Sequence, residues 1–108
     1  MKAMNQDAAP VSGSWTHSFE EDEAGVLVYR PTHSFAFPPA RGRETLEFGE
    51  GGGLIERTPG PDDRPRDKAG RWTALGMNRF GLGGTADAPD RVIEVIESTP
   101  DILKIRKI

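Results

Sequence analysis

The side chains best suited to binding chemistry in this chain are one tyrosine and a group of arginines. Arginine binds a carboxylate or phosphate through two parallel hydrogen bonds, and a tyrosine hydroxyl adds a directional contact. Such a set favours an anionic ligand. The alternative for each arginine is a surface ion pair with one of the glutamates, which contributes only about 0 to 1 kcal/mol. The residues concerned are Tyr29, Arg30, Arg41, Arg43 and Arg79, with Arg71 nearby.

Two polar residues alternate in phase with apolar neighbours, and this phase predicts that they face the interior. His17 is in phase with Trp15, and Arg30 is in phase with Val28. An inward arginine needs a partner of opposite charge. A buried, hydrogen-bonded histidine is the commoner explanation of His17, because a general base would also need a substrate position and an orienting carboxylate. Glu20 and Glu21 are close to it in sequence, and the pattern does not choose between them.

The composition excludes several kinds of chemistry. The chain has no cysteine, which rules out disulfides, thiolate nucleophiles and cysteine-ligated metals. His17 and His33 lack the spacing of a recognised metal site, so neither a metal nor another cofactor is expected. With 14 basic and 17 acidic residues the net charge is −3, which argues against nucleic-acid and membrane partners. No apolar run is long enough for a signal or a membrane span, so a cytoplasmic location is expected.

Short segments with apolar and polar residues in alternation predict an all-β fold. Residues 32–42 contain adjacent prolines and should form a loop over one end of the sheet, and residues 58–70 should form a solvated loop. The predicted strands are residues 14–20, 25–30, 43–48, 54–57, 71–75, 79–82, 91–97 and 101–108.

Eight consecutive strands would leave exposed edges unless the sheet closes on itself. We therefore predict a small eight-stranded antiparallel up-and-down barrel, formed by residues 13–108 as a single domain of the 108-residue chain. Residues 1–12 are predicted to form a flexible arm, because residues 1–10 are rich in polar and small side chains. The apolar final strand, residues 102–108, offers a contact for a homodimer, so the chain is expected to be a monomer or a homodimer.

Gly13 and Trp15 open the first strand, and Arg106 lies in the last. With the eight-stranded pattern, these residues resemble the lipocalin-like (calycin) barrels. The resemblance implies that Trp15 closes one end of the barrel and that Arg106 packs across its ring, a cation-π contact of roughly 0.5 to 2 kcal/mol.

The resemblance and the composition together lead to a first hypothesis, a non-enzymatic barrel that binds a small, partly apolar anionic ligand. A second hypothesis is a protein-interaction or inhibitor barrel, which would use residues 1–13 or the loop 35–43. The third is a small enzyme with His17 or Glu20 as acid-base and with Arg30 and Arg43 as anion stabilisers. In the first hypothesis the ligand contacts are Arg30, Tyr29, His17 and Arg43, and the apolar walls are Trp72 and Phe80.

Overall fold

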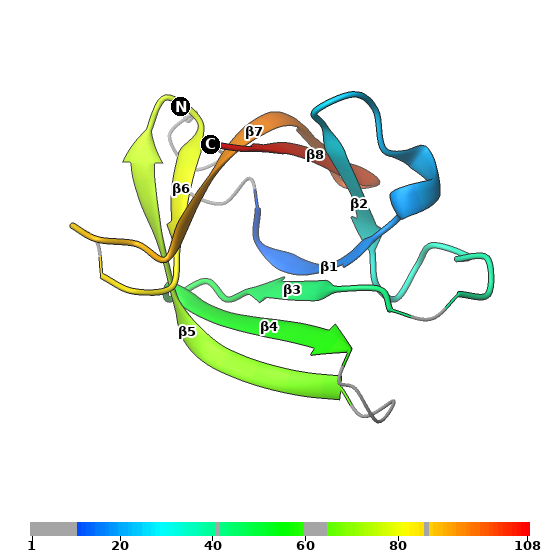
Figure 1. Ribbon diagram of the computed structural model, residues 1–108, viewed down its shortest axis with the longest axis horizontal. Coiled ribbons are helices and arrows are strands. Elements are labelled where there is room, and N and C mark those ends of the chain that lie inside the picture. Colours follow the sequence, from blue (N-terminus) through cyan, green and yellow to red (C-terminus); the bar gives the residue numbers. More distant parts are fainter. Residues whose placement is uncertain (1–10, 41, 60–64, 86) are drawn as a thin grey trace.

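Eight antiparallel strands close into a barrel in the computed structural model, which describes residues 11–40, 42–59, 65–85 and 87–108 (Figure 1). This confirms the predicted all-β, eight-stranded barrel. The strands are β1 (Gly13–His17), β2 (Leu27–Pro31), β3 (Thr45–Phe48), β4 (Gly53–Pro59), β5 (Pro65–Gly76), β6 (Arg79–Leu82), β7 (Arg91–Thr99) and β8 (Ile102–Lys107).

The order of the strands differs at one place from a sequential up-and-down barrel. β1 lies between β2 and β3, so that β2 pairs with β8 and not with β3. β8, the strand that offered a contact for a homodimer, pairs with both β7 and β2, so both of its edges are hydrogen-bonded within the barrel.

The connection from β2 to β3 must therefore pass β1, and it does so on the outside of the barrel. The Thr32 hydroxyl lies 2.8 Å from the hydroxyls of both Ser14 and Thr16, and the Thr16 hydroxyl lies 2.9 Å from that of Thr45. Thr16 alternates with the buried Trp15, so these hydroxyls lie on the outer face of β1. Residues 32–40 are thus a crossover along the wall, and not part of the predicted loop over one end.

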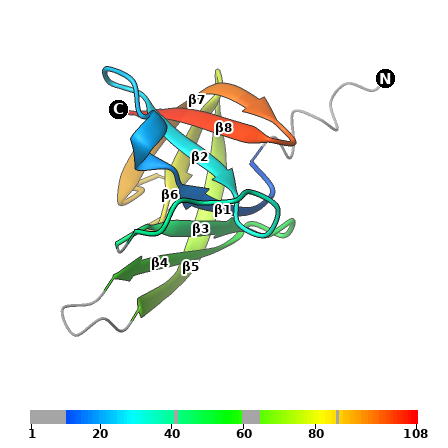
Figure 2. The same ribbon diagram turned by 90° about the vertical axis from the view of Figure 1, so that its right-hand side faces the viewer.

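β4 and β5 continue beyond the barrel as a two-stranded ribbon (Figures 1 and 2). Their ladder runs from the pair Gly53 and Arg71 to the pair Pro59 and Pro65. Most of the residues predicted to form a solvated loop, 58–70, are therefore strand. Both faces of a projecting ribbon contact water, so its sequence need not alternate between apolar and polar residues. The segment around Asp67 and Lys68 therefore lacks the pattern that predicts a strand.

β1 is also shorter than predicted. It ends at His17, and the 3₁₀-helix η1 (Phe19–Glu21) follows directly. No helix among the described residues is long and apolar enough to cross a membrane.

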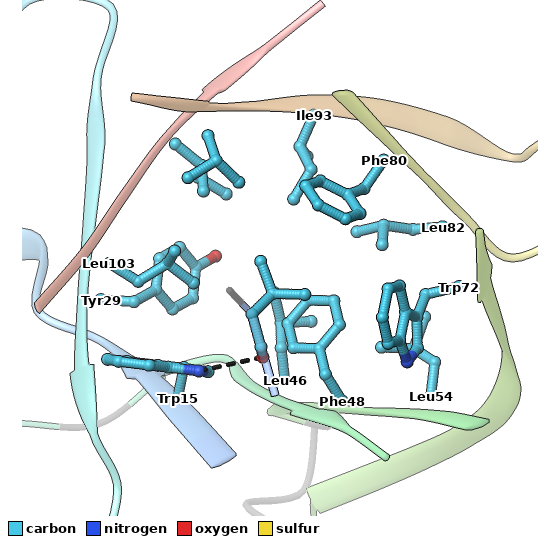
Figure 3. Close-up of a cluster of buried hydrophobic side chains, with 13 residues drawn as sticks. Trp15, Tyr29, Leu46, Phe48, Leu54, Trp72, Phe80, Leu82, Ile93 and Leu103 are labelled. Atoms are coloured by element: carbon cyan, nitrogen blue, oxygen red, sulfur yellow. Dashed lines mark hydrogen bonds between the residues drawn. The ribbon is translucent and has the colours of Figure 1, made fainter. Parts of the chain in front are cut away.

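The interior is filled by side chains from opposite walls, with Trp15 and Tyr29 on one side and Trp72 and Phe80 on the other (Figure 3). Val11, within the stretch predicted to be a flexible arm, is completely buried in this cluster, and its carbonyl oxygen accepts a hydrogen bond from Trp15 Nε1 at 3.2 Å. Residues 1–10 of that predicted arm lie outside the described residues.

Candidate functional site

Two of the predicted ligand contacts, His17 and Tyr29, do come together inside the barrel. Their rings are stacked with centroids 5.0 Å apart. His17 Nε2 lies 3.0 Å from the carboxylate of Asp22, and the Tyr29 hydroxyl donates a 2.7 Å hydrogen bond to Glu44. Burial, together with the charge of Glu44, raises the pKa of Tyr29 well above its ordinary value, so the phenol stays protonated and donates this bond.

Arg91 links this group to the opposite wall. Its Nη2 donates to Glu44 at 3.2 Å and to Glu56 at 2.6 Å. Two strands, β6 and β5, separate β7 from β4 in the sheet, so the contact between Arg91 and Glu56 crosses the interior. We call these six residues the polar cluster: His17, Asp22, Tyr29, Glu44, Glu56 and Arg91.

The polar cluster holds three carboxylates against one arginine and a histidine, and each of its side chains contacts another member. A ligand anion would have to displace a carboxylate there. Sequence reasoning missed Arg91 and Glu56, although their phase reveals them. Arg91 alternates in step with the buried Ile93, and Glu56 with the buried Leu54.

Arg30 faces outward, which corrects the predicted inward orientation. Its Nε and Nη2 bind both carboxylate oxygens of Glu21, at 2.9 and 2.7 Å, and its guanidinium lies 5.0 Å from the ring of Phe35. The phase argument failed because Val28, although almost fully buried, lies on the outer face opposite Lys104.

Arg43 has a parallel role on the crossover. It binds both carboxylate oxygens of Glu20, at 2.9 and 2.5 Å, and lies between the rings of Phe19 and Phe37 at 4.6 and 5.2 Å. Arg30 and Arg43 therefore clamp the connections around β1 and β2, and their carboxylate-binding faces are occupied.

The structure brings together only some of the residues of the enzyme hypothesis, because Arg43 contacts Glu20 and also donates to the His17 carbonyl oxygen at 3.0 Å. His17 is in phase with the core, whereas Glu20 is exposed and bound to Arg43, and Arg30 lies on the outer face. The contact between Glu20 and Arg43 is an exposed ion pair, in which the carboxylate already occupies the guanidinium. The crossover aromatics Phe35 and Phe37, expected as partner contacts in the second hypothesis, pack against the same two arginines.

The clamp between Arg30 and Glu21 makes stability depend on pH. Hydrogen bonding to Arg30 lowers the pKa of Glu21 from its ordinary 4.5 to about 2. Because this pKa is lower in the folded state, the pair stabilises the fold above pH 4.5, and the contribution is lost as the pH falls toward 2. Solvent screening limits its size, since the Glu21 side chain is 36% exposed.

We therefore expect Glu21→Gln to lower the urea midpoint at pH 7 modestly and to flatten its decline between pH 4.5 and 2. Urea unfolding of the variant and the wild type at several pH values checks this. A decline as steep in the variant as in the wild type would contradict the assignment.

The expected plug contact is not made. Trp15 is buried and bound to the Val11 carbonyl, whereas Arg106 is exposed on the outer face, where its Nε and Nη2 contact Glu94 at 3.3 and 3.1 Å. Since β2 lies between β1 and β8, the two residues are not on neighbouring strands.

Trp72 and Phe80, the expected pocket walls, are packing residues. Their ring centroids lie 5.8 Å apart, and Trp72 also meets Phe48 edge-on at 5.9 Å. The Trp72 Nε1 donates a 2.9 Å bond to the carbonyl oxygen of Gly49, which anchors the β3–β4 turn to the core.

A ligand-sized hollow lies instead on the outer wall of the barrel, across β1, β3, β4 and β5. Its volume is about 480 Å³, within the range of small-molecule sites. Ser14, Glu47, Ile55 and Ala69 occupy successive register positions across these strands and point outward. We call this hollow the outer groove. Its lining is mainly glycine and apolar, and includes Gly49, Gly53, Ile55, Ala69, Ser14 and Glu47.

Two charged side chains flank the outer groove. Glu47 is paired with Arg57. Arg71 lies opposite Gly53 in the ladder, is exposed, and donates a long 3.3 Å bond to the Gly51 carbonyl. Within the described part of the chain, no carboxylate lies within ion-pair distance of Arg71. Unlike the guanidinium groups of Arg30 and Arg43, that of Arg71 thus remains available to bind an anion.

The fold and this groove define the chain as a closed eight-stranded antiparallel barrel with a ligand-sized hollow on its outer wall. No family model, curated protein or solved structure matches the chain.

Proposed function

We propose that this chain is a lipocalin-like, non-enzymatic binding barrel for a small, partly apolar anionic ligand, and that the ligand lies in the outer groove. The observation that carries the proposal is an apolar hollow of about 480 Å³ beside an arginine that has no carboxylate partner among the described residues. Apolar lining with a few placed polar groups is typical of ligand sites.

The interior is a less suitable place for this ligand. Thirteen buried side chains form one continuous cluster there, and Trp72 and Phe80 are part of it. The polar cluster is richer in carboxylates than in cations, which disfavours an anion at that position. The proposal retains the anionic ligand of the sequence-based hypothesis. The arginine that binds the anion is now Arg71, and not Arg30 or Arg43.

Titration calorimetry with 2-naphthoate and with decanoate, two carboxylates of similar size, tests the proposal. We expect at least one of them to bind, and Arg71→Gln to weaken that binding roughly tenfold, as the loss of a charged hydrogen bond would. Arg79→Gln is the matched control, because Arg79 is also an exposed arginine but lies on β6, whereas Arg71 lies opposite the groove residue Gly53. The proposal fails if neither carboxylate binds, or if the two variants have equal effects.

A further inference from the structure

We infer that the apolar part of the ligand is a planar aromatic ring system, which lies flat on the outer groove with its carboxylate at Arg71. The inference rests on the proposed binding function, because it names the class of ligand for the same groove. It comes from the glycines of the groove and from the place of the Arg71 guanidinium.

Gly53 is a glycine that the fold itself does not require. Its φ lies outside the left-handed region, and a Cβ added there would meet no atom within 4 Å. A glycine in a strand weakens the strand, because the unfolded chain loses more freedom when it orders. The bare backbone at this position therefore benefits something other than folding, and Gly53 lines the groove.

Several positions along the groove carry no side chain or a small one. Gly53 lies beside Gly49, whose amide bonds the Gly53 carbonyl at 2.8 Å, and the next outward pair along the ladder is Ile55 and Ala69. At Gly49, Gly53 and Ala69 little or no side chain stands above the outer surface of the sheet, and these positions form a strip of exposed backbone. A planar ring buries one whole face on such a strip without losing internal freedom, whereas a flexible alkyl chain must be ordered to lie there.

The β3–β4 turn positions Arg71, which would bind the carboxylate of the ligand. Gly52 has φ +89°, and a Cβ on it would lie 2.9 Å from Arg71 Nη2. The missing side chain thus makes room for the guanidinium at the rim of the groove. Glu47, the carboxylate that lines the groove, is held by Arg57, so it does not compete for Arg71.

The test compares 2-naphthoate with decanoate by titration calorimetry on the full chain, with one groove variant and one control variant. We expect 2-naphthoate to bind at least tenfold more tightly than decanoate. Gly53→Val should weaken 2-naphthoate binding at least tenfold, because the side chain covers the strip. Ala74→Val is the control, because Ala74 is an exposed strand position on β5 that does not line the groove. Circular dichroism confirms that both variants are folded.

The outcomes separate the two claims. Equal binding of both carboxylates, weakened by Arg71→Gln, overturns the aromatic class and leaves the proposed function standing. Unchanged 2-naphthoate affinity in Gly53→Val also overturns the inference. Binding of neither carboxylate overturns the proposed function, and the inference with it.

Discussion

Replacing Arg91 with alanine should destabilise the barrel by about 2 to 3 kcal/mol at neutral pH, measured by urea unfolding. The substitution leaves Glu44 and Glu56 inside the barrel without the guanidinium that joins them, and Tyr29 still donates to Glu44. Breaking a fully buried ion pair costs about 3 to 5 kcal/mol. The expected value is smaller because the Arg91 side chain is 31% exposed, so water screens part of the remaining charge.

Arg106→Ala is the matched control for this prediction. Arg106 also binds a glutamate, Glu94, at 3.1 Å, but on the outer face with its side chain 52% exposed. Its loss should cost no more than about 1 kcal/mol. Adding Glu44→Gln and Glu56→Gln to Arg91→Ala should recover part of the lost stability, since the uncompensated charges are removed. Equal losses for Arg91→Ala and Arg106→Ala would contradict a cross-barrel role.

Most strand positions could be predicted because apolar alternation is a local property. Strand order is not local. The prediction assumed that consecutive strands are neighbours, as hairpins are, and nothing in residues 32–42 distinguishes a crossover past β1 from a loop over one end. The predicted contact between Arg106 and Trp15 depended on that assumption. The prediction was wrong because β8 pairs with β2 and not with β1.

The candidate site was harder to predict, for a related reason. Ion pairs between Arg30 and Glu21 and between Arg43 and Glu20 depend on where the crossover and η1 lie, not on the strand pattern. The outer groove depends on the register of β3, β4 and β5, which places glycines and small residues side by side. A depression made by absent side chains leaves no periodic signal in the sequence. Arg71 was noticed only as one arginine among several.

Replacing Gly84 with alanine should destabilise the fold by about 3 kcal/mol or more. Gly84 has φ +61°, a region that costs an ordinary residue about 1 to 2 kcal/mol. A Cβ there would also lie 2.3 Å from the Ala88 carbonyl oxygen and 2.9 Å from the Asp90 amide nitrogen. Both are backbone atoms. They cannot move without disturbing the turn in which the Ala88 oxygen accepts a 3.2 Å bond from the Thr85 amide.

Gly25→Ala separates the two causes of this loss. Gly25 has a similar φ of +74°, but a Cβ on it would meet nothing within 4 Å, so only the backbone strain of about 1 to 2 kcal/mol should be measured. Urea unfolding of both variants gives the difference, which is the steric part. Because the turn after Gly84 leads directly into β7, its displacement should also shift Arg91 and weaken the cross-barrel pair. The losses from Gly84→Ala and Arg91→Ala should then be less than additive in the double variant, whereas Gly25→Ala and Arg91→Ala should add.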